Sequence, residues 1–234
     1  MKTVLFVSLF LVYAFLSANS EKAINEITQK NEATDENKNA ETPTKLNIKY
    51  YYETLCPYCR NFETDFFREI LEKLSNYLDI QTYPYGNVYV SKVDNKTISE
   101  CQHGPEECYG NKLHACALDI IKNHTAALLY NNCMMDRSQE DRGSDDKAAD
   151  KCGTIMGVNS TAIKKCAQGE RGTELFDHYG NETRIANIFG VPNIWINGTK
   201  YERTLDVFGD ICAYFVNTIP PCAISRVNKS EEND

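Results

Sequence analysis

The sequence predicts an α/β fold that is divided by a helical insertion, and three observations support this fold class. A strand pattern passes directly into a long helical pattern near the beginning of the chain, and a second strand candidate follows at 80–90, with a turn expected around 84–86. Residues 91–188 show no convincing strand, yet they hold six of the ten cysteines. Strand patterns return at 189–201, and one more helical pattern follows them. The expected order is therefore β-α-β, helical insertion, β-β-α.

The first strand and helix are adjacent in the chain. Residues 46–52 alternate between apolar and more polar side chains, which is the period of a half-buried strand. The apolar residues that follow recur at helical spacing and predict a helix of about five turns. These apolar residues are Phe62, Phe66, Ile70, Leu71, Leu74 and Leu78.

A C-x-x-C motif, Cys56-Pro57-Tyr58-Cys59, lies where the strand passes into the helix. A cysteine at a helix N-terminus is favoured as a thiolate by unpaired backbone N–H groups and by the helix dipole. Pro57 suits the first helical turn because its missing N–H would have no partner there. We interpret the pair as redox-active. The alternatives are a structural disulfide, or a zinc site completed by Cys101 and His103, for which an oxidising secretory route is unfavourable.

The two ends of the chain differ in composition from its centre. Residues 1–20 have a lysine, a short apolar run and small residues, which predicts a signal peptide. Residues 21–44 are acidic and poor in large apolar side chains, so we expect a disordered leader or propeptide, and residues 223–234 predict a short polar tail. The expected domain spans 45–222. No later run has the roughly 18 apolar residues of a membrane span.

The remaining cysteines and the sequons both favour the secretory pathway. Eight cysteines remain outside the C-x-x-C motif, an even number that is consistent with four structural disulfides whose pairing the sequence leaves open. They are Cys101, Cys108, Cys116, Cys133, Cys152, Cys166, Cys212 and Cys222. Six glycosylation sequons begin at Asn95, Asn123, Asn159, Asn181, Asn197 and Asn228. The net charge of −8 argues against a nucleic-acid partner.

The insertion and the last elements show weaker patterns. Apolar side chains from Leu113 to Leu128 share one helical face, Asp141–Asp150 predicts a polar linker, and Thr161–Ala167 predicts a short helix. A strand ending at Ile196 is followed by Asn197-Gly198, a strong signal for a two-residue hairpin turn. A final helix is expected between Leu205 and Phe215. The complete order is that of a thioredoxin-like fold with a disulfide-stapled helical insertion.

The stretch 101–116 resembles the signature of the gamma-interferon-inducible lysosomal thiol reductases (GILT), C-Q-H-G-x2-E-C-x2-N-x4-C. Every fixed position matches: Cys101, Gln102, His103, Gly104, Glu107, Cys108, Asn111 and Cys116. The resemblance implies reduction of protein disulfides in acidic endosomes or lysosomes. It also implies that Cys56 attacks the substrate and that Cys59 resolves the mixed disulfide. The likeness to thioredoxin-like folds implies that Val191 faces this pair and that Pro192 is cis.

The resemblance gives the signature residues no chemical role. We expect His103 to be a structural side chain in a loop tied by a disulfide, and Glu107 and Asn111 to act as caps or turn formers. Pro57-Tyr58 is also the dipeptide of glutaredoxins. No metal or organic cofactor is implied, but a small-molecule thiol must reduce the enzyme again.

Two rival functions remain open at this point. A disulfide oxidase or isomerase of the secretory pathway would show the same element order, because the direction of exchange depends on reduction potential. A secreted, non-catalytic binding protein on the same fold is the second rival, although an intact C-x-x-C motif argues against it. For a reductase that works near pH 5, we expect the pKa of Cys56 to be strongly depressed, and Arg60 adds a positive charge beside it.

Overall fold

The computed structural model describes residues 44–94, 96–202, 206–216 and 219–223. The expected signal peptide, all of the expected leader but Thr44, and all of the expected tail but Ala223 lie outside these residues. Among the described residues, no helix combines the length and the apolar character needed to cross a membrane.

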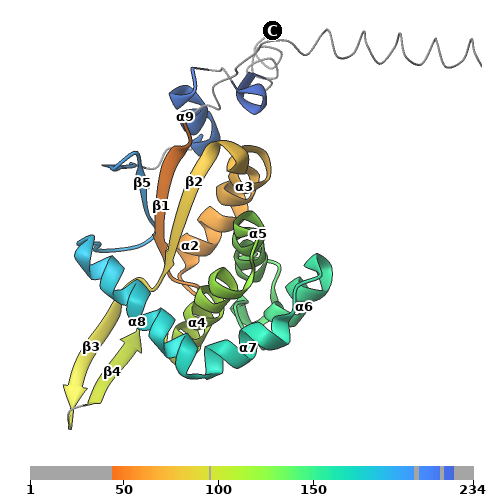
Figure 1. Cartoon of the computed structure of the whole chain (residues 1–234). Coiled ribbons are helices and arrows are strands. Elements are labelled where there is room, and N and C mark those ends of the chain that lie inside the picture. Colours follow the sequence, from red (N-terminus) through yellow and green to blue (C-terminus); the bar gives the residue numbers. More distant parts are fainter. Residues whose placement is uncertain (1–43, 95, 203–205, 217–218, 224–234) are drawn as a thin grey trace, which may run out of the picture. The chain divides into compact units, whose positions relative to one another are not determined.

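A four-stranded sheet with the order β2-β1-β5-β6 forms the centre of the fold (Figure 1). Strand β1 (Leu46–Tyr52) pairs in parallel with β2 (Leu78–Pro84) and antiparallel with β5 (Asn193–Ile196). Strand β6 (Thr199–Lys200) returns after a turn in which Asn197 and Gly198 both have positive φ, as the Asn-Gly signal predicts. The thioredoxin-like fold class is confirmed. Apolar side chains of β1, β2 and β5 form the main core with those of the helices that follow β1 and of the C-terminal helix.

The helix after the C-x-x-C motif has about the predicted length of five turns but is less regular than predicted. A π-helical stretch interrupts it, and this extra residue in the turn shifts the buried face so that Phe67 is buried while Phe66 is half-buried. Leu78, expected on the helix, is instead the first residue of β2. The consecutive segments are α2 (Pro57–Phe62), η1 (Glu63–Phe67), α3 (Arg68–Leu74) and η2 (Ser75–Tyr77).

A two-stranded hairpin, which the sequence pattern did not predict, follows β2. Strands β3 (Val88–Val93) and β4 (Lys96–Cys101) pair antiparallel and extend away from the four-stranded sheet (Figure 1). Because most side chains of β3 are exposed, it lacks the apolar alternation of a half-buried strand. The expected second strand at 80–90 is therefore two strands, and the region inserted into the fold begins with this hairpin.

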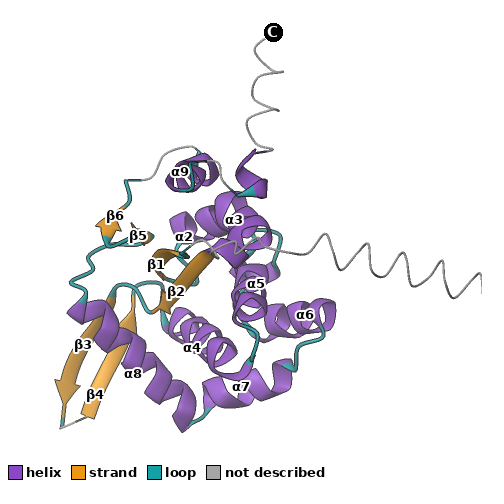
Figure 2. Ribbon diagram, turned by 45° about the horizontal axis from the view of Figure 1, so that its top comes forward, coloured by secondary structure: helices purple, strands orange, loops and turns teal. Residues whose placement is uncertain are grey.

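Helices make up the rest of the insertion (Figure 2). The helix expected over 113–128 is two helices, because Asn123 caps a new one by accepting a hydrogen bond from the Ala126 N–H at 2.9 Å. The expected linker 141–150 is wrong, since Asp145 caps a helix in the same way. The short helix near Cys166 is confirmed. The helical segments are α4 (Pro105–Ile120), α5 (His124–Met135), η3 (Glu140–Arg142), α6 (Asp146–Met156), α7 (Ser160–Gln168) and α8 (Glu170–Ile185).

All eight cysteines outside the C-x-x-C motif are paired. Two bonds join helices of the insertion, one closes the turn between β4 and α4, and one fastens the end of helix α9 (Val207–Tyr214). The end of the predicted final helix at Leu205 lies outside the described residues. The bonds are Cys101–Cys108, Cys116–Cys166, Cys133–Cys152 and Cys212–Cys222.

Candidate active site

The two free thiols occupy the N-terminus of α2. Cys56 is the residue before the helix, and Cys59 lies inside its first turn. Cys56 is 5% exposed and Cys59 is fully buried, so an incoming disulfide meets Cys56 first. Pro57 is the first helical residue, and Tyr58 is 68% exposed beside the thiols.

The environments of the two thiols drive their pKa values apart. The pKa of Cys56 is lowered to about 6, chiefly because the Cys59 thiol donates a hydrogen bond to it, with help from backbone N–H groups of Cys59 and Tyr58 and from the charge of His103. Burial raises the pKa of Cys59 well above its usual value. The pair thus combines a thiolate at the start of α2 with a more deeply buried thiol that holds a proton.

Arg60 does not face the thiols as the sequence suggested. Its guanidinium donates hydrogen bonds to the carbonyl oxygens of Met135 and Asp136, at 3.1 and 2.9 Å, at the end of α5. The positive charge that acts on Cys56 comes from His103 of the signature.

The peptide bond between Val191 and Pro192 is cis, in agreement with the expectation. It directly precedes β5, the neighbour of β1 in the sheet. Val191 packs against the main core, to which Cys56 and Cys59 also belong. The segment before β5 and the C-x-x-C segment therefore border the same core.

Glu107 of the signature holds the loop that leads to Cys56. One carboxylate oxygen, Oε2, accepts a hydrogen bond from the Leu55 N–H at 3.3 Å and lies 2.6 Å from Nδ1 of His103. The other, Oε1, accepts from the His103 N–H at 3.0 Å. Glu107 therefore does accept a backbone hydrogen bond in the turn before α4, as expected, but its buried side chain also binds the Leu55 N–H next to the thiols, which was not expected.

Asn111 lies one helical turn further along α4 and forms a hydrogen bond to the same loop. Its side-chain oxygen accepts from the Thr54 N–H at 3.1 Å, and its amide donates to the Tyr85 carbonyl at 3.2 Å. Asn111 is therefore a buried bridge and not a turn former. Of the other signature residues, Gly104 has a φ of 94° directly before α4, and Gln102 accepts a hydrogen bond from Asn87 at 2.8 Å.

Glu53, which sequence reasoning missed, completes the surroundings of the thiols. It follows β1 directly, its side chain is 1% exposed, and burial raises its pKa to about 7. One carboxylate oxygen accepts a hydrogen bond from the Asn87 N–H, and the other lies 3.4 Å from Nδ1 of His103. An acidic residue at the end of a buried strand, three positions before the C-x-x-C motif, is the signal that could have identified it.

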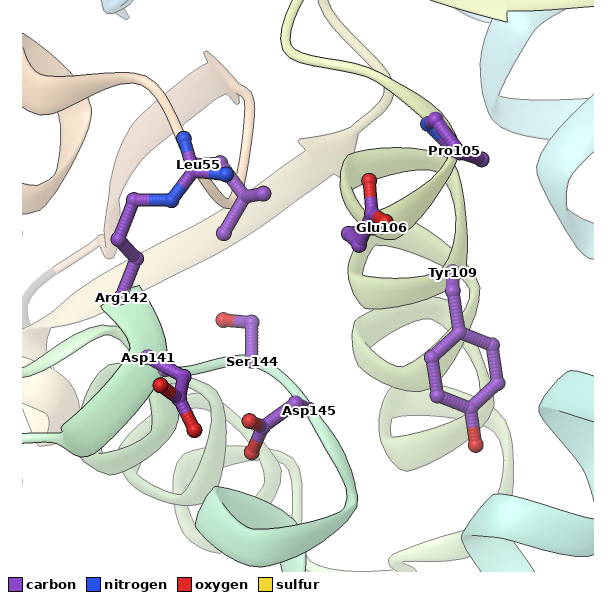
Figure 3. Close-up of a pocket in the computed structure, with 9 residues that line it drawn as sticks. Leu55, Pro105, Glu106, Tyr109, Asp141, Arg142, Ser144 and Asp145 are labelled. Carbon is purple, nitrogen blue, oxygen red and sulfur yellow. The ribbon is translucent and has the colours of Figure 1, made fainter.

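A cavity of about 370 Å³ opens beside Leu55, the residue before Cys56. Figure 3 shows Pro105, Glu106 and Tyr109 of α4 on one side of it, and Arg142 on the other, next to Leu55. The segment between α5 and α6 contributes three further polar side chains to its lining, Asp141, Ser144 and Asp145. The cavity thus borders the residue before Cys56, while neither thiol is among its lining residues.

The structure also bears on the zinc alternative and on the glycosylation sequons. The zinc alternative fails in the described structure because Cys101 is bonded to Cys108 and offers no thiolate. Sequons Asn95 and Asn228 lie outside the described residues. The other four sequon asparagines are exposed, namely Asn123, Asn159, Asn181 and Asn197.

Comparison with protein families and relatives identifies what this chain resembles. Residues 47–156 match the family model of the gamma interferon inducible lysosomal thiol reductases. A gamma-interferon-responsive lysosomal thiol protein of Arabidopsis thaliana is 30% identical over 196 residues, 80% of this chain and 79% of the relative. The gamma-interferon-inducible lysosomal thiol reductase of Mus musculus is 28% identical over 190 residues, 79% of this chain and 74% of the relative.

Solved structures share the fold at low sequence identity. DsbA from Mycobacterium tuberculosis in its reduced form aligns with a TM-score of 0.56 and 15% identity, over 82% of this chain and 93% of that chain. The disulfide bond oxidoreductase DsbG from the same organism aligns with a TM-score of 0.55 and 14% identity, over 79% and 90%. At this identity the likeness concerns the fold alone.

Proposed function

Because this chain belongs to the gamma interferon inducible lysosomal thiol reductase family and is a thiol-disulfide oxidoreductase, we propose that it reduces disulfide bonds of proteins through Cys56 and Cys59. One observation carries the proposal: the pKa of Cys56 is lowered to about 6 by a hydrogen bond from a buried thiol, Cys59. That arrangement supplies both a nucleophile and a second thiol within its reach.

The reaction is thiol–disulfide exchange in two steps. The Cys56 thiolate attacks one sulfur of the substrate disulfide, the substrate S–S bond breaks, and the departing sulfur takes a proton. Cys59 then loses its proton and attacks the sulfur of Cys56, which forms the Cys56–Cys59 bond and releases the second substrate sulfur as a thiol. The substrate gains two electrons, and the enzyme dithiol is oxidised to a disulfide.

We place this reaction in an acidic compartment of the endosomal and lysosomal route. The relatives are lysosomal thiol reductases by name. With a pKa of about 6, Cys56 is roughly one-tenth thiolate at pH 5, whereas an ordinary thiol with a pKa of about 8.5 is ~0.03% thiolate. The lowered pKa thus supports useful exchange in acid, although intrinsic nucleophilicity falls as the pKa falls.

The oxidised enzyme must be reduced again, and we propose a small-molecule thiol as the reductant. The cavity beside Leu55 supports this part of the proposal, because it is large enough for a small molecule and leads to the segment that carries Cys56. Its charged lining residues, among them Arg142, Asp141 and Asp145, suit a polar or zwitterionic thiol.

Trapping of the mixed disulfide tests the function. We expect the Cys59→Ser enzyme to accumulate a covalent complex with a disulfide substrate such as insulin, because Cys56 attacks and nothing releases it. The Cys56→Ser enzyme should neither trap substrate nor reduce it, and Tyr58→Phe, which leaves both thiols in place, serves as the matched control. Equal trapping by both serine variants would reverse the assignment, and failure of the wild type to reduce any disulfide would favour a non-catalytic binder.

The pH dependence of alkylation tests the acid part of the proposal. In the Cys59→Ser enzyme, with a chelator in the buffer, we expect a midpoint below that of an ordinary thiol but above 6, because this variant lacks the Cys59 thiol. Wild-type turnover should persist at pH 5. A midpoint near 8 together with no turnover below pH 6 would contradict acid reduction, and a strongly oxidising Cys56–Cys59 potential would favour an oxidase or isomerase.

A further inference from the structure

Three side chains from separate parts of the chain converge beside the thiols. Glu53 follows β1, His103 lies between β4 and α4, and Glu107 is in the first turn of α4. One oxygen or nitrogen atom from each of them lies within 4.8 Å of those of the other two. The Nδ1 atom of His103 is 2.6 Å from Glu107 Oε2 and 3.4 Å from Glu53 Oε2.

The two carboxylates are out of contact with solvent. The side chains of Glu53 and Glu107 are 1% and 0% exposed, while that of His103 is 22% exposed and leaves a path from the surface. Among the described residues, neither carboxylate forms an ion pair with a lysine or an arginine. Two buried acidic groups therefore have at most one imidazolium as a counter-charge, and burying unpaired charge is costly.

The hydrogen bonds of this cluster leave one acceptor unsatisfied. Glu107 accepts from the Leu55 N–H and from the His103 N–H and shares a hydrogen bond with Nδ1 of His103, and Glu53 Oε1 accepts from the Asn87 N–H. Glu53 Oε2 is buried and has no hydrogen-bond partner. Nδ1 of His103 can form only one good hydrogen bond, and its short contact of 2.6 Å is with Glu107, while Glu53 Oε2 lies 3.4 Å away.

From this geometry we propose that Glu53, His103 and Glu107 form a binding site for a divalent transition metal of the zinc class. An imidazole nitrogen and carboxylate oxygens are ligands that zinc accepts, and three protein ligands leave a fourth position open. The ion would take the place of the shared proton, satisfy Glu53 Oε2 and neutralise the two acids. It would also fix the loop before Cys56 to α4 through Glu107, which already binds the Leu55 N–H.

This site is independent of the reductase reaction, and its test requires no turnover. Because a reduced C-x-x-C pair can itself bind zinc, the measurement uses the Cys56→Ser, Cys59→Ser double variant of the full chain without an affinity tag, in which no thiol is free. Calorimetric titration with zinc at pH 7 should show one site, zinc should raise the melting temperature, and cobalt(II) should give the visible absorption of a tetrahedral site.

Three variants in that background locate the ion. Glu53→Gln and Glu107→Gln should each weaken zinc binding by more than about 100-fold, because even groups that only support a ligand contribute roughly 10- to 100-fold. Glu106→Gln, an exposed neighbour on the same turn, should bind zinc as the parent does. The side-chain amide in Glu53→Gln retains an oxygen for the Asn87 N–H, so this variant is expected to fold, and its circular dichroism and melting without metal verify that.

The rival occupant is a proton on Glu53, whose burial raises its pKa to about 7. Absence of zinc binding at pH 7, with a Glu53 carboxyl that titrates near 7 by infrared spectroscopy, would overturn the metal site in favour of that proton. Zinc binding that survives Glu53→Gln would equally overturn it, since the ion would then lie elsewhere.

Discussion

The sheet region and the helical insertion use different side chains to form their cores. The main core under the sheet is built mainly from leucine, isoleucine, tyrosine and phenylalanine, and its buried residues, within the described part of the chain, include no alanine. In the core of the insertion, eight of thirteen buried residues are alanine or cysteine: Ala115, Ala117, Ala148, Ala149, Ala167, Cys116, Cys133 and Cys152. Since burial of apolar area drives folding, the insertion gains less per residue than the sheet region does.

Small side chains let the helices of the insertion approach one another closely. A Cβ atom added at Gly172 of α8 would lie 2.5 Å from the carbonyl oxygen of Cys166 in α7, a contact that the backbone does not tolerate. Close approach without large side chains provides little buried area, and two disulfides, Cys116–Cys166 and Cys133–Cys152, lie within this core. The comparison teaches that covalent bonds compensate in the insertion for what apolar packing provides in the sheet region.

The largest effect is expected from removal of the Cys116–Cys166 bond. This bond joins α4 to α7 across 50 residues, so replacing both cysteines by alanine should lower the free energy of unfolding by about 4 kcal/mol. Urea unfolding at constant pH measures the change, and hydrogen exchange should show that amides of the insertion lose protection before those of β1 and β2.

Cys212–Cys222 is the matched control in the sheet region. It closes only 10 residues, and its removal should cost about 3 kcal/mol or less, without early exchange in the insertion. An insertion that keeps its hydrogen-exchange protection without Cys116–Cys166 would show that its packing suffices, and the contrast between the two regions would then fail.

The second effect concerns a buried acid in the sheet region. Glu63 in η1 is 3% exposed and accepts a hydrogen bond from the Asn132 amide at 2.6 Å, and burial raises its pKa to about 8. A raised pKa means that its contribution to stability is complete below the unfolded-state value near 4.3 and is lost as the pH rises toward 8. Between pH 5 and 7.5 the loss is on the order of 3 kcal/mol. The Glu63→Gln protein should not show this loss of stability.

The stability contributed by His114, in the insertion, changes with pH in the opposite direction. The Glu63→Gln protein must therefore be compared with wild type at each pH. Burial lowers the pKa of His114 to about 3, and stability from this group is therefore lost as the pH falls below about 6.5. Because His114 is present in both proteins, the difference between their unfolding free energies isolates Glu63. Glu72→Gln on the exposed face of α3 should leave the pH dependence unchanged. A Glu63→Gln protein with the wild-type slope would contradict the assignment.

The sheet region was largely predictable from the sequence because its signals are local. Apolar alternation located β1, the Asn-Gly dipeptide located the turn between β5 and β6, and the C-x-x-C motif stood between a strand and a helix. The π-helical stretch at Glu63–Phe67 was not predictable, since it changes the helical register without a distinct residue pattern. The pairing of β3 with β4 was also not predictable, because their mostly exposed side chains do not alternate regularly between apolar and polar.

The surroundings of the thiols depend on contacts between distant residues, which spacing alone does not reveal. Glu53 and Glu107 are far apart in the chain, yet both meet His103. The sequence identified His103, Glu107 and Asn111 as parts of a signature but assigned them structural or capping roles. Their actual contacts with the loop before Cys56 follow from the way α4 packs against the end of β1, a tertiary arrangement.

The smallest effect is expected from an ion pair that joins two helices of the insertion. Lys164 Nζ in α7 lies 2.7 Å from Asp150 Oδ1 and 2.8 Å from Oδ2 in α6, and Ser160 donates a hydrogen bond to the same carboxylate. The Asp150 side chain is 55% exposed, so water and salt screen the attraction, and Lys164→Met should cost less than about 1 kcal/mol of unfolding free energy.

Salt dependence separates this attraction from packing by the lysine stem. In roughly 1 M salt, where the screening length falls to about 3 Å, the difference between Lys164→Met and wild type should shrink, because most of it is electrostatic. Lys165→Met is the matched control, since Lys165 is exposed on the same helix and forms no ion pair with the described residues. A loss above about 2 kcal/mol for Lys164→Met alone would show that surface charges share in holding the insertion together. Such a loss would contradict the expectation that an exposed ion pair contributes little beside the disulfides of the insertion.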